Sequence, residues 1–231
     1  MEPSRRLRRM LWTGTIFLAV IGVAVAVRRM VAVVPVILHG YRPMAAPRNP
    51  VAAQFASLDD LFARYPILTF IHIAPGILFM ILGPLQFSRT VRARHPKFHR
   101  VNGRIFLACA AIVGISALVM SLGMPAIGGV NQAAATTLFA TFFLFALERA
   151  FVHIRRREIA LHREWMMRAF GTGLAVATIR PIIGFFFATS RVTGLTPHEF
   201  FGAAFWLGFT LQLMAVEAWI QHTRSAVISN Q

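Results

Sequence analysis

The sequence predicts an all-α integral membrane protein, a helical bundle with six transmembrane helices. Its 231 residues are 57% hydrophobic and 14% charged, with a mean hydropathy of +0.63, which is far more apolar than a soluble domain of this length. Six apolar runs are long enough to cross a hydrocarbon core of roughly 30 Å as helices. The alternation typical of a membrane β-barrel is absent from these runs. They cover residues 11–27, 67–87, 105–124, 133–153, 165–189 and 200–221.

Basic residues predict the orientation of this bundle. Arg-rich segments lie before the first run, between the second and third runs, and between the fourth and fifth runs, whereas residues 125–132 carry no charge. Because such segments resist translocation, both termini are expected in the cytosol. The chain is therefore predicted to be a multi-pass protein of a cytoplasmic membrane.

The net charge of +16 indicates a membrane surface rather than nucleic acid as the partner. Most basic residues flank apolar runs, so we expect contact with the lipid bilayer and its anionic head groups. Cys109 is the single cysteine in the sequence, which excludes an intrachain disulfide. The oligomeric state is left open by the sequence.

The first run poses a problem, because Arg28 and Arg29 follow it on the side predicted to be outside. A helix over 11–38, about 40 Å long, would hold this pair at the outer head groups. The alternative is a cleaved export signal, but no small-residue cleavage site precedes a folded soluble domain. We expect an uncleaved first helix after a basic cytosolic N-terminus at 1–10.

Residues 39–66 form the predicted extracytoplasmic loop. Its first half is rich in proline and is expected to be extended. Ser57, followed by Asp59 and Asp60, resembles a capped helix start, which predicts a short interfacial helix over 58–65. A five-helix membrane domain at 67–222 and a cytosolic tail at 223–231 complete the expected organisation.

Two basic loops end in His-Arg pairs, His99-Arg100 and His162-Arg163, directly before the third and fifth apolar runs. This short likeness suggests an internal duplication. It predicts a central four-helix bundle made from helices two to five, with helices one and six at its sides.

Four segments carry a family resemblance: Gly83-Pro84-Leu85-Gln86-Phe87, His99-Arg100-Val101-Asn102-Gly103-Arg104, His162-Arg163-Glu164-Trp165-Met166-Met167-Arg168 and Arg180-Pro181. Together they resemble a family of predicted bacterial multi-pass membrane proteins that carry domain of unknown function 2306, which implies a bacterial cytoplasmic (inner) membrane as the location. The resemblance covers roughly residues 68–219. It implies a helical membrane domain and supplies no activity, so no catalytic residue can be named from it.

Ionisable groups inside apolar runs are paired or functional by default. Arg180 precedes Pro181, and His72 lies three residues before Pro75, so we expect broken helices beside both groups. The substrate-site hypothesis places an anionic or carbonyl-bearing solute on Arg180 and His72, with Glu148 and Glu217 as further polar groups. In the alternative, Arg180 bonds exposed carbonyls and His72 packs two helices.

A second group of candidates lies near the predicted cytosolic side. His99 with His153 or His162 is the pattern of a bis-imidazole site for haem b, with Arg100, Arg104 and Arg168 near its propionates. His72 is the remaining cofactor candidate. The alternative is that the His-Arg pairs contact lipid head groups. Glu148, His153 and His162 follow no recognised metal-site spacing, so no metal beyond a haem iron is expected.

Three functional classes remain open on the sequence. A transmembrane redox protein, linked to b-type haem, a quinone or a redox partner, is placed first. The alternatives are an ion-gradient-driven transporter of a small anionic or carbonyl-bearing solute and a non-catalytic membrane subunit.

Overall fold

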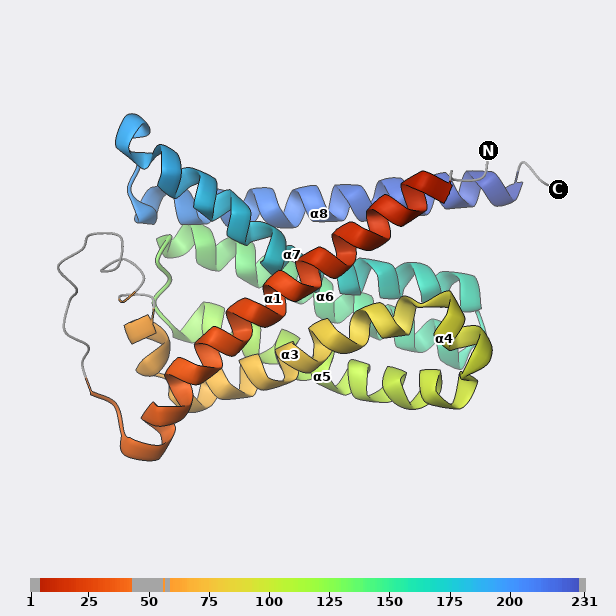
Figure 1. Ribbon diagram of the computed structural model, residues 1–231, viewed down its shortest axis with the longest axis horizontal. Helices are drawn as coiled ribbons and strands as arrows, with labels where there is room; N and C mark the ends of the chain where they lie inside the picture. The colour runs from red at the N-terminus through yellow and green to blue at the C-terminus, as the bar shows by residue number, and fades with distance from the viewer. Residues whose placement is uncertain (1–4, 43–55, 57–58, 229–231) are drawn as a thin grey trace.

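Every secondary-structure element in the described part of the chain is a helix. The computed structural model describes residues 5–42, 56 and 59–228, and Figure 1 shows their arrangement. The elements are α1 (Arg5–His39), α3 (Pro66–Phe87), α4 (Arg89–Arg94), α5 (Pro96–Gly123), α6 (Gly129–Arg155), α7 (Ile159–Thr193) and α8 (Pro197–Ile228). Residues 59–63 are also helical, within the predicted interfacial helix. Ser57 and the proline-rich stretch lie outside the described residues.

Six of these helices are long and apolar enough to cross a membrane, which confirms the predicted bundle of six. The helices extend further than the apolar runs. α5 starts at Pro96 and α7 at Ile159, so His99 and His162 lie inside first turns rather than in loops. Proline suits a first helical turn because the amide it lacks has no partner there, and this lets α5 begin before its apolar run.

The predicted breaks at Pro75 and Pro181 are wrong. α3 continues through Pro75 and α7 through Pro181. A proline removes one backbone hydrogen bond, whereas ending the helix in lipid would expose several backbone groups that no water can satisfy. Continuing the helix is therefore the less costly arrangement.

The core confirms the central bundle of four helices. One phenylalanine from each of α3, α5, α6 and α7 meets at its centre. The ring centroid of Phe79 lies 4.8 Å from that of Phe106, 5.7 Å from that of Phe143 and 5.6 Å from that of Phe170. Gly83 lies against the Phe170 ring, where it leaves no room for a Cβ atom. Small residues thus let large rings fill the space between the helices.

The remaining two spans lie at the sides of this bundle. α1 crosses α3 and α7, and α8 packs along α7 and α6 (Figure 1). α1 begins and α8 finishes at the same end of the molecule, which we call the termini end. The opposite end, where α6 begins and α7 finishes, is the far end. α4 and the first turn of α7 lie at the termini end.

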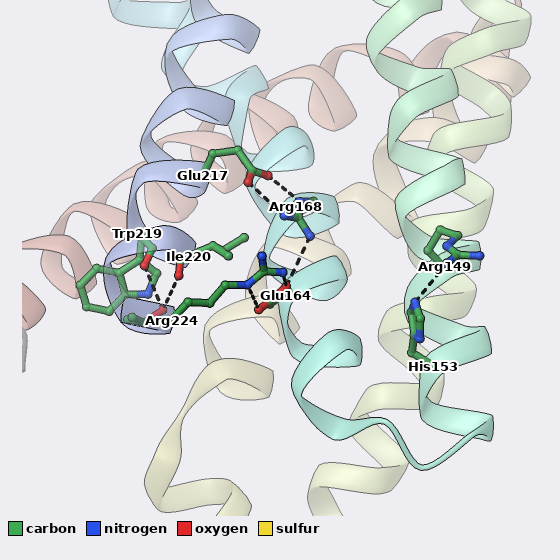
Figure 2. A network of polar contacts seen from close by, with 9 residues as sticks. Arg149, His153, Glu164, Arg168, Glu217, Trp219, Ile220 and Arg224 are labelled. Carbon is green, nitrogen blue, oxygen red and sulfur yellow. Dashed lines mark hydrogen bonds and ion pairs between the residues drawn. The ribbon is translucent and has the colours of Figure 1, made fainter. Parts of the chain in front are cut away.

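A chain of charges joins α7 to α8 (Figure 2). Arg168 donates two hydrogen bonds to Glu217, at 2.5 and 3.0 Å, and its guanidinium lies 4.6 Å from the ring centroid of Trp165. Glu164 lies 3.9 Å from Arg168 and accepts a hydrogen bond of 2.5 Å from Arg224. The two acids thus neutralise cations that would otherwise stand alone at the membrane boundary.

Adding a methyl group at Gly83 is expected to destabilise the bundle. The Cβ atom of Gly83→Ala would overlap the Phe170 ring, at a cost of about 1–3 kcal/mol. Gly184→Ala is the matched control, because nothing lies within 4 Å of a Cβ atom there. Thermal unfolding in detergent, followed by circular dichroism, should show a lower midpoint for Gly83→Ala alone. Equal midpoints for the two variants would contradict this packing.

The Arg168–Glu217 pair should behave as a coupled unit. Glu217→Met leaves the Arg168 side chain, of which 13% is exposed, with only the more distant Glu164 carboxylate, so the midpoint should fall. Adding Arg168→Met should recover part of the loss, with a coupling of about 0.5–3 kcal/mol in a double-mutant cycle. Strictly additive losses would show that the two side chains do not stabilise each other.

Candidate functional site

A half-open cavity of about 860 Å³ lies at the termini end, between α1, α4, α7 and α8. We call it the basic cavity. None of the described residues that line it is acidic. Six arginines line it: Arg5, Arg8, Arg9, Arg89, Arg92 and Arg163.

Charged and apolar groups occupy different depths of the basic cavity. The arginines belong to α4 and to the first two turns of α1 and α7, whereas most of the apolar lining comes from further into the spans. Gln212, a polar residue at that depth, accepts a hydrogen bond of 3.0 Å from Thr178. The cavity therefore has a cationic mouth and an apolar floor. The apolar lining includes Leu11, Trp12, Phe87, Met167, Phe170, Leu174, Val216 and Trp219.

The short helix α4 places two of these arginines. The Ser88 hydroxyl caps α4 by accepting a hydrogen bond of 3.3 Å from the Val91 amide. Arg89 and Arg92 are three residues apart and therefore share one face of the helix. Both lie close enough to Arg163 of α7 for the like charges to repel one another. An anion between them would relieve this repulsion.

The motif residues form a buried polar cluster close to the cavity. Asn102 of α5 donates to Gln86 of α3 at 2.8 Å and to the Leu82 carbonyl at 3.3 Å. The Gln86 amide nitrogen lies 3.5 Å from His99 Nε2. A Cβ atom on Gly103 would come within 2.8 Å of the same nitrogen, so only glycine fits there without a shift. The Gln86 and His-Arg-Val-Asn-Gly motifs thus join α3 to α5.

Three of the candidate histidines lie at the termini end. His162 interacts electrostatically with both His99 and His153. His162 Nδ1 donates to the Ala150 carbonyl at 2.8 Å. His153 contacts Glu158 through Nδ1 and Arg149 through Nε2, the latter at 3.4 Å.

Of the three histidines, His153 does not fit the haem hypothesis, and the His99–His162 pair stays a prediction. Both ring nitrogens of His153 contact charged side chains, which leaves neither for iron. Seven and eight residues deeper along the same helices as His99 and His162, the rings of Phe106 and Phe170 approach to 6.1 Å and fill the space between the helices at that depth. No group of three metal-ligating side chains occurs in the described ranges, and Glu148 is exposed on another face of α6.

The four residues predicted to bind a substrate do not come together in the structure. Glu217 is paired with Arg168, twelve residues before Arg180 on α7 and so about 18 Å from it along the helix. His72 lies 2.9 Å from the Ser116 hydroxyl of α5, a contact that joins two helices. Arg180 is exposed on α7. Arg100 is also exposed, on α5, and does not line the basic cavity.

Sequence reasoning treated the cavity arginines as topology signals and did not recognise a site in them. A signal was present, because Arg5 with Arg8 and Arg89 with Arg92 each have the three-residue spacing of one helix face. That these faces meet Arg163 across one cavity depends on how α1 crosses α7, which no local pattern contains.

Comparison with known proteins supports the membrane assignment. A family model described as "Predicted membrane protein (DUF2306)" matches residues 69–220, the part of the chain from α3 to α8. A search of curated proteins and a search of solved structures gave no match. The match spans more than half of the chain and contains the Gln86–Asn102 contact and the His162 motif. The chain therefore belongs to the DUF2306 family of predicted membrane proteins.

Proposed function

We propose that this protein binds an amphiphilic anion, a molecule with a phosphate or carboxylate head and an apolar tail, in the basic cavity. The observation that carries the proposal is the combination of six arginines, no acidic residue among the described lining and an apolar floor in one cavity of about 860 Å³. Guanidinium groups bind phosphate and carboxylate through paired hydrogen bonds, which suits them to such a head group.

The lining residues restrict the ligand class. A fully hydrophilic anion would leave the apolar floor without a partner, and a neutral quinone would leave six cations without one. An acyl or isoprenoid chain with an anionic head satisfies both parts. At about 25 cal/mol per Å² of apolar surface, burying such a tail favours binding by several kcal/mol.

The arrangement of α1 and α8 supports entry from the bilayer. Both helices line the basic cavity, and they flank α7 without packing extensively on each other. Trp12 of α1 and Trp219 of α8 stand on its two sides. Amphipathic tryptophan rings favour the head-group region, so the cavity mouth would lie at the level of lipid heads.

We also propose that the termini end faces the cytosol of a bacterial inner membrane. The Arg-rich segments gather at this end, and such segments stay on the cytosolic side. The basic cavity would then take its ligand from the cytosolic leaflet, where anionic lipids attract basic segments. Neither redox chemistry nor gradient-driven transport is needed for this binding function.

Ligand binding can be read from the two cavity tryptophans. In Trp165→Phe/Trp206→Phe protein in neutral detergent, Trp12 and Trp219 are the remaining tryptophans and both line the cavity. A brominated short-chain phosphatidylglycerol should quench their fluorescence at lower concentration than the matching phosphatidylcholine. Arg92→Gln and Arg163→Gln should each weaken phosphatidylglycerol binding about tenfold. Both side chains are exposed, so folding should persist.

The apolar floor has its own matched pair of variants. Ala215→Phe would fill part of the cavity, whereas Ala218→Phe changes an exposed position of α8 outside it. Binding should weaken only in Ala215→Phe. Equal quenching by the two lipids, unaffected by any of these variants, would exclude the proposed site.

The orientation is testable by labelling in spheroplasts. In a Cys109→Ala background, Leu195→Cys at the far end should react with a membrane-impermeant maleimide from outside. His95→Cys at the termini end should react only after permeabilisation. Both positions are exposed. The reverse pattern would place the cavity on the outer side.

A further inference from the structure

A second group of arginines lies at the far-end side of the bundle, and its charge is incompletely balanced. Arg28 of α1 donates two hydrogen bonds to Asp59, at 3.0 and 2.8 Å. Arg29 pairs with the same carboxylate, and its guanidinium lies 4.3 Å from the ring centroid of Phe62. Asp59, which precedes α3, is therefore the shared partner of Arg28 and Arg29 of α1.

Arg180 of α7 adds a third cation to this group. It interacts electrostatically with both Arg28 and Arg29, across the crossing of α1 and α7. None of the described residues gives it a hydrogen bond or an ion pair. Its side chain is exposed, as are those of its apolar neighbours Val176 and Phe185, at 37% and 65%.

Asp60, the acid next to Asp59, forms hydrogen bonds with two groups other than these three arginines. Asp60 accepts a hydrogen bond of 3.0 Å from Arg64 and one of 2.6 Å from Tyr41. The second contact raises the pKa of the Tyr41 hydroxyl, which keeps it a neutral donor. Three guanidinium groups with one carboxylate leave an excess of two positive charges beside a membrane span.

We infer that Arg28, Arg29 and Arg180 form a second anion-binding site, for an oxyanion of the phosphate class, either free or as a lipid head group. A cation in a membrane span costs several kcal/mol unless an anion or water reaches it. Arg180 has no protein anion among the described residues, and two further guanidinium groups stand beside it. A phosphate has enough oxygens to accept hydrogen bonds from more than one of them.

This site is separate from the basic cavity. Arg163 and Arg180 are seventeen residues apart on one continuous helix, which corresponds to about 25 Å. No residue of the arginine group lines the cavity. The inference therefore goes beyond the proposed function and fails or stands independently of it.

The test uses the full chain with the basic cavity disabled by Arg92→Gln/Arg163→Gln. Thermal midpoints are measured in neutral detergent against inorganic phosphate, dioctanoyl phosphatidylglycerol and dioctanoyl phosphatidylcholine, because a ligand of the folded state raises the midpoint. We expect an anion-dependent rise in this background that disappears when Arg180→Gln is added. Arg180→Lys keeps the charge and should keep most of the rise, which separates lost binding from misfolding.

Asp59→Asn is expected to affect anion binding in the opposite direction to Arg180→Gln. Removing the one carboxylate of the group should strengthen anion binding by about tenfold, because the anion no longer competes with it. A rise with inorganic phosphate assigns the site to a free oxyanion, and a rise with phosphatidylglycerol alone assigns it to a lipid head. The inference is overturned if Arg180→Gln leaves the anion response unchanged, or if Asp59→Asn weakens it.

Discussion

Hydrocarbon does not solvate charge, and this constraint accounts for where each class of residue lies in the protein. The apolar runs become continuous helices even through Pro75 and Pro181, because an interrupted backbone would have no partners in lipid. Phenylalanine rings fill the centre of the bundle, and the charged residues gather towards its two ends. Some of the charges at the edge of the spans are paired, as Arg168 is with Glu217.

Two groups of arginines have fewer acidic partners in the described part of the protein than they have positive charges, and α1 contributes to both groups. At the termini end, α1, α4 and α7 bring six arginines around one cavity whose described lining contains no acid. Near the far end, Arg28 and Arg29 share Asp59 while Arg180 stands beside them. The same helix crossing thus creates both sites, one with an apolar floor and one on an exposed surface.

The features of the fold that depend on local sequence pattern could be predicted from the sequence. Run lengths gave the six spans, and the likeness of the two basic loops gave the central bundle of α3, α5, α6 and α7. The pairing of Arg28 and Arg29 with Asp59 could not be predicted from the sequence, because that contact joins residues about thirty positions apart. The pairing of His99 with His153 as haem ligands is not supported, because both ring nitrogens of His153 contact charged side chains.

The central claim is that the basic cavity holds an amphiphilic anion, and native mass spectrometry of the protein extracted gently from its own membrane tests it most directly. The account predicts one anionic amphiphile retained per chain after neutral lipids and detergent have been removed by collision. Retention should be lost when the cavity arginines are substituted. Release of zwitterionic and anionic lipids at the same collision energy, with or without those arginines, would contradict the claim.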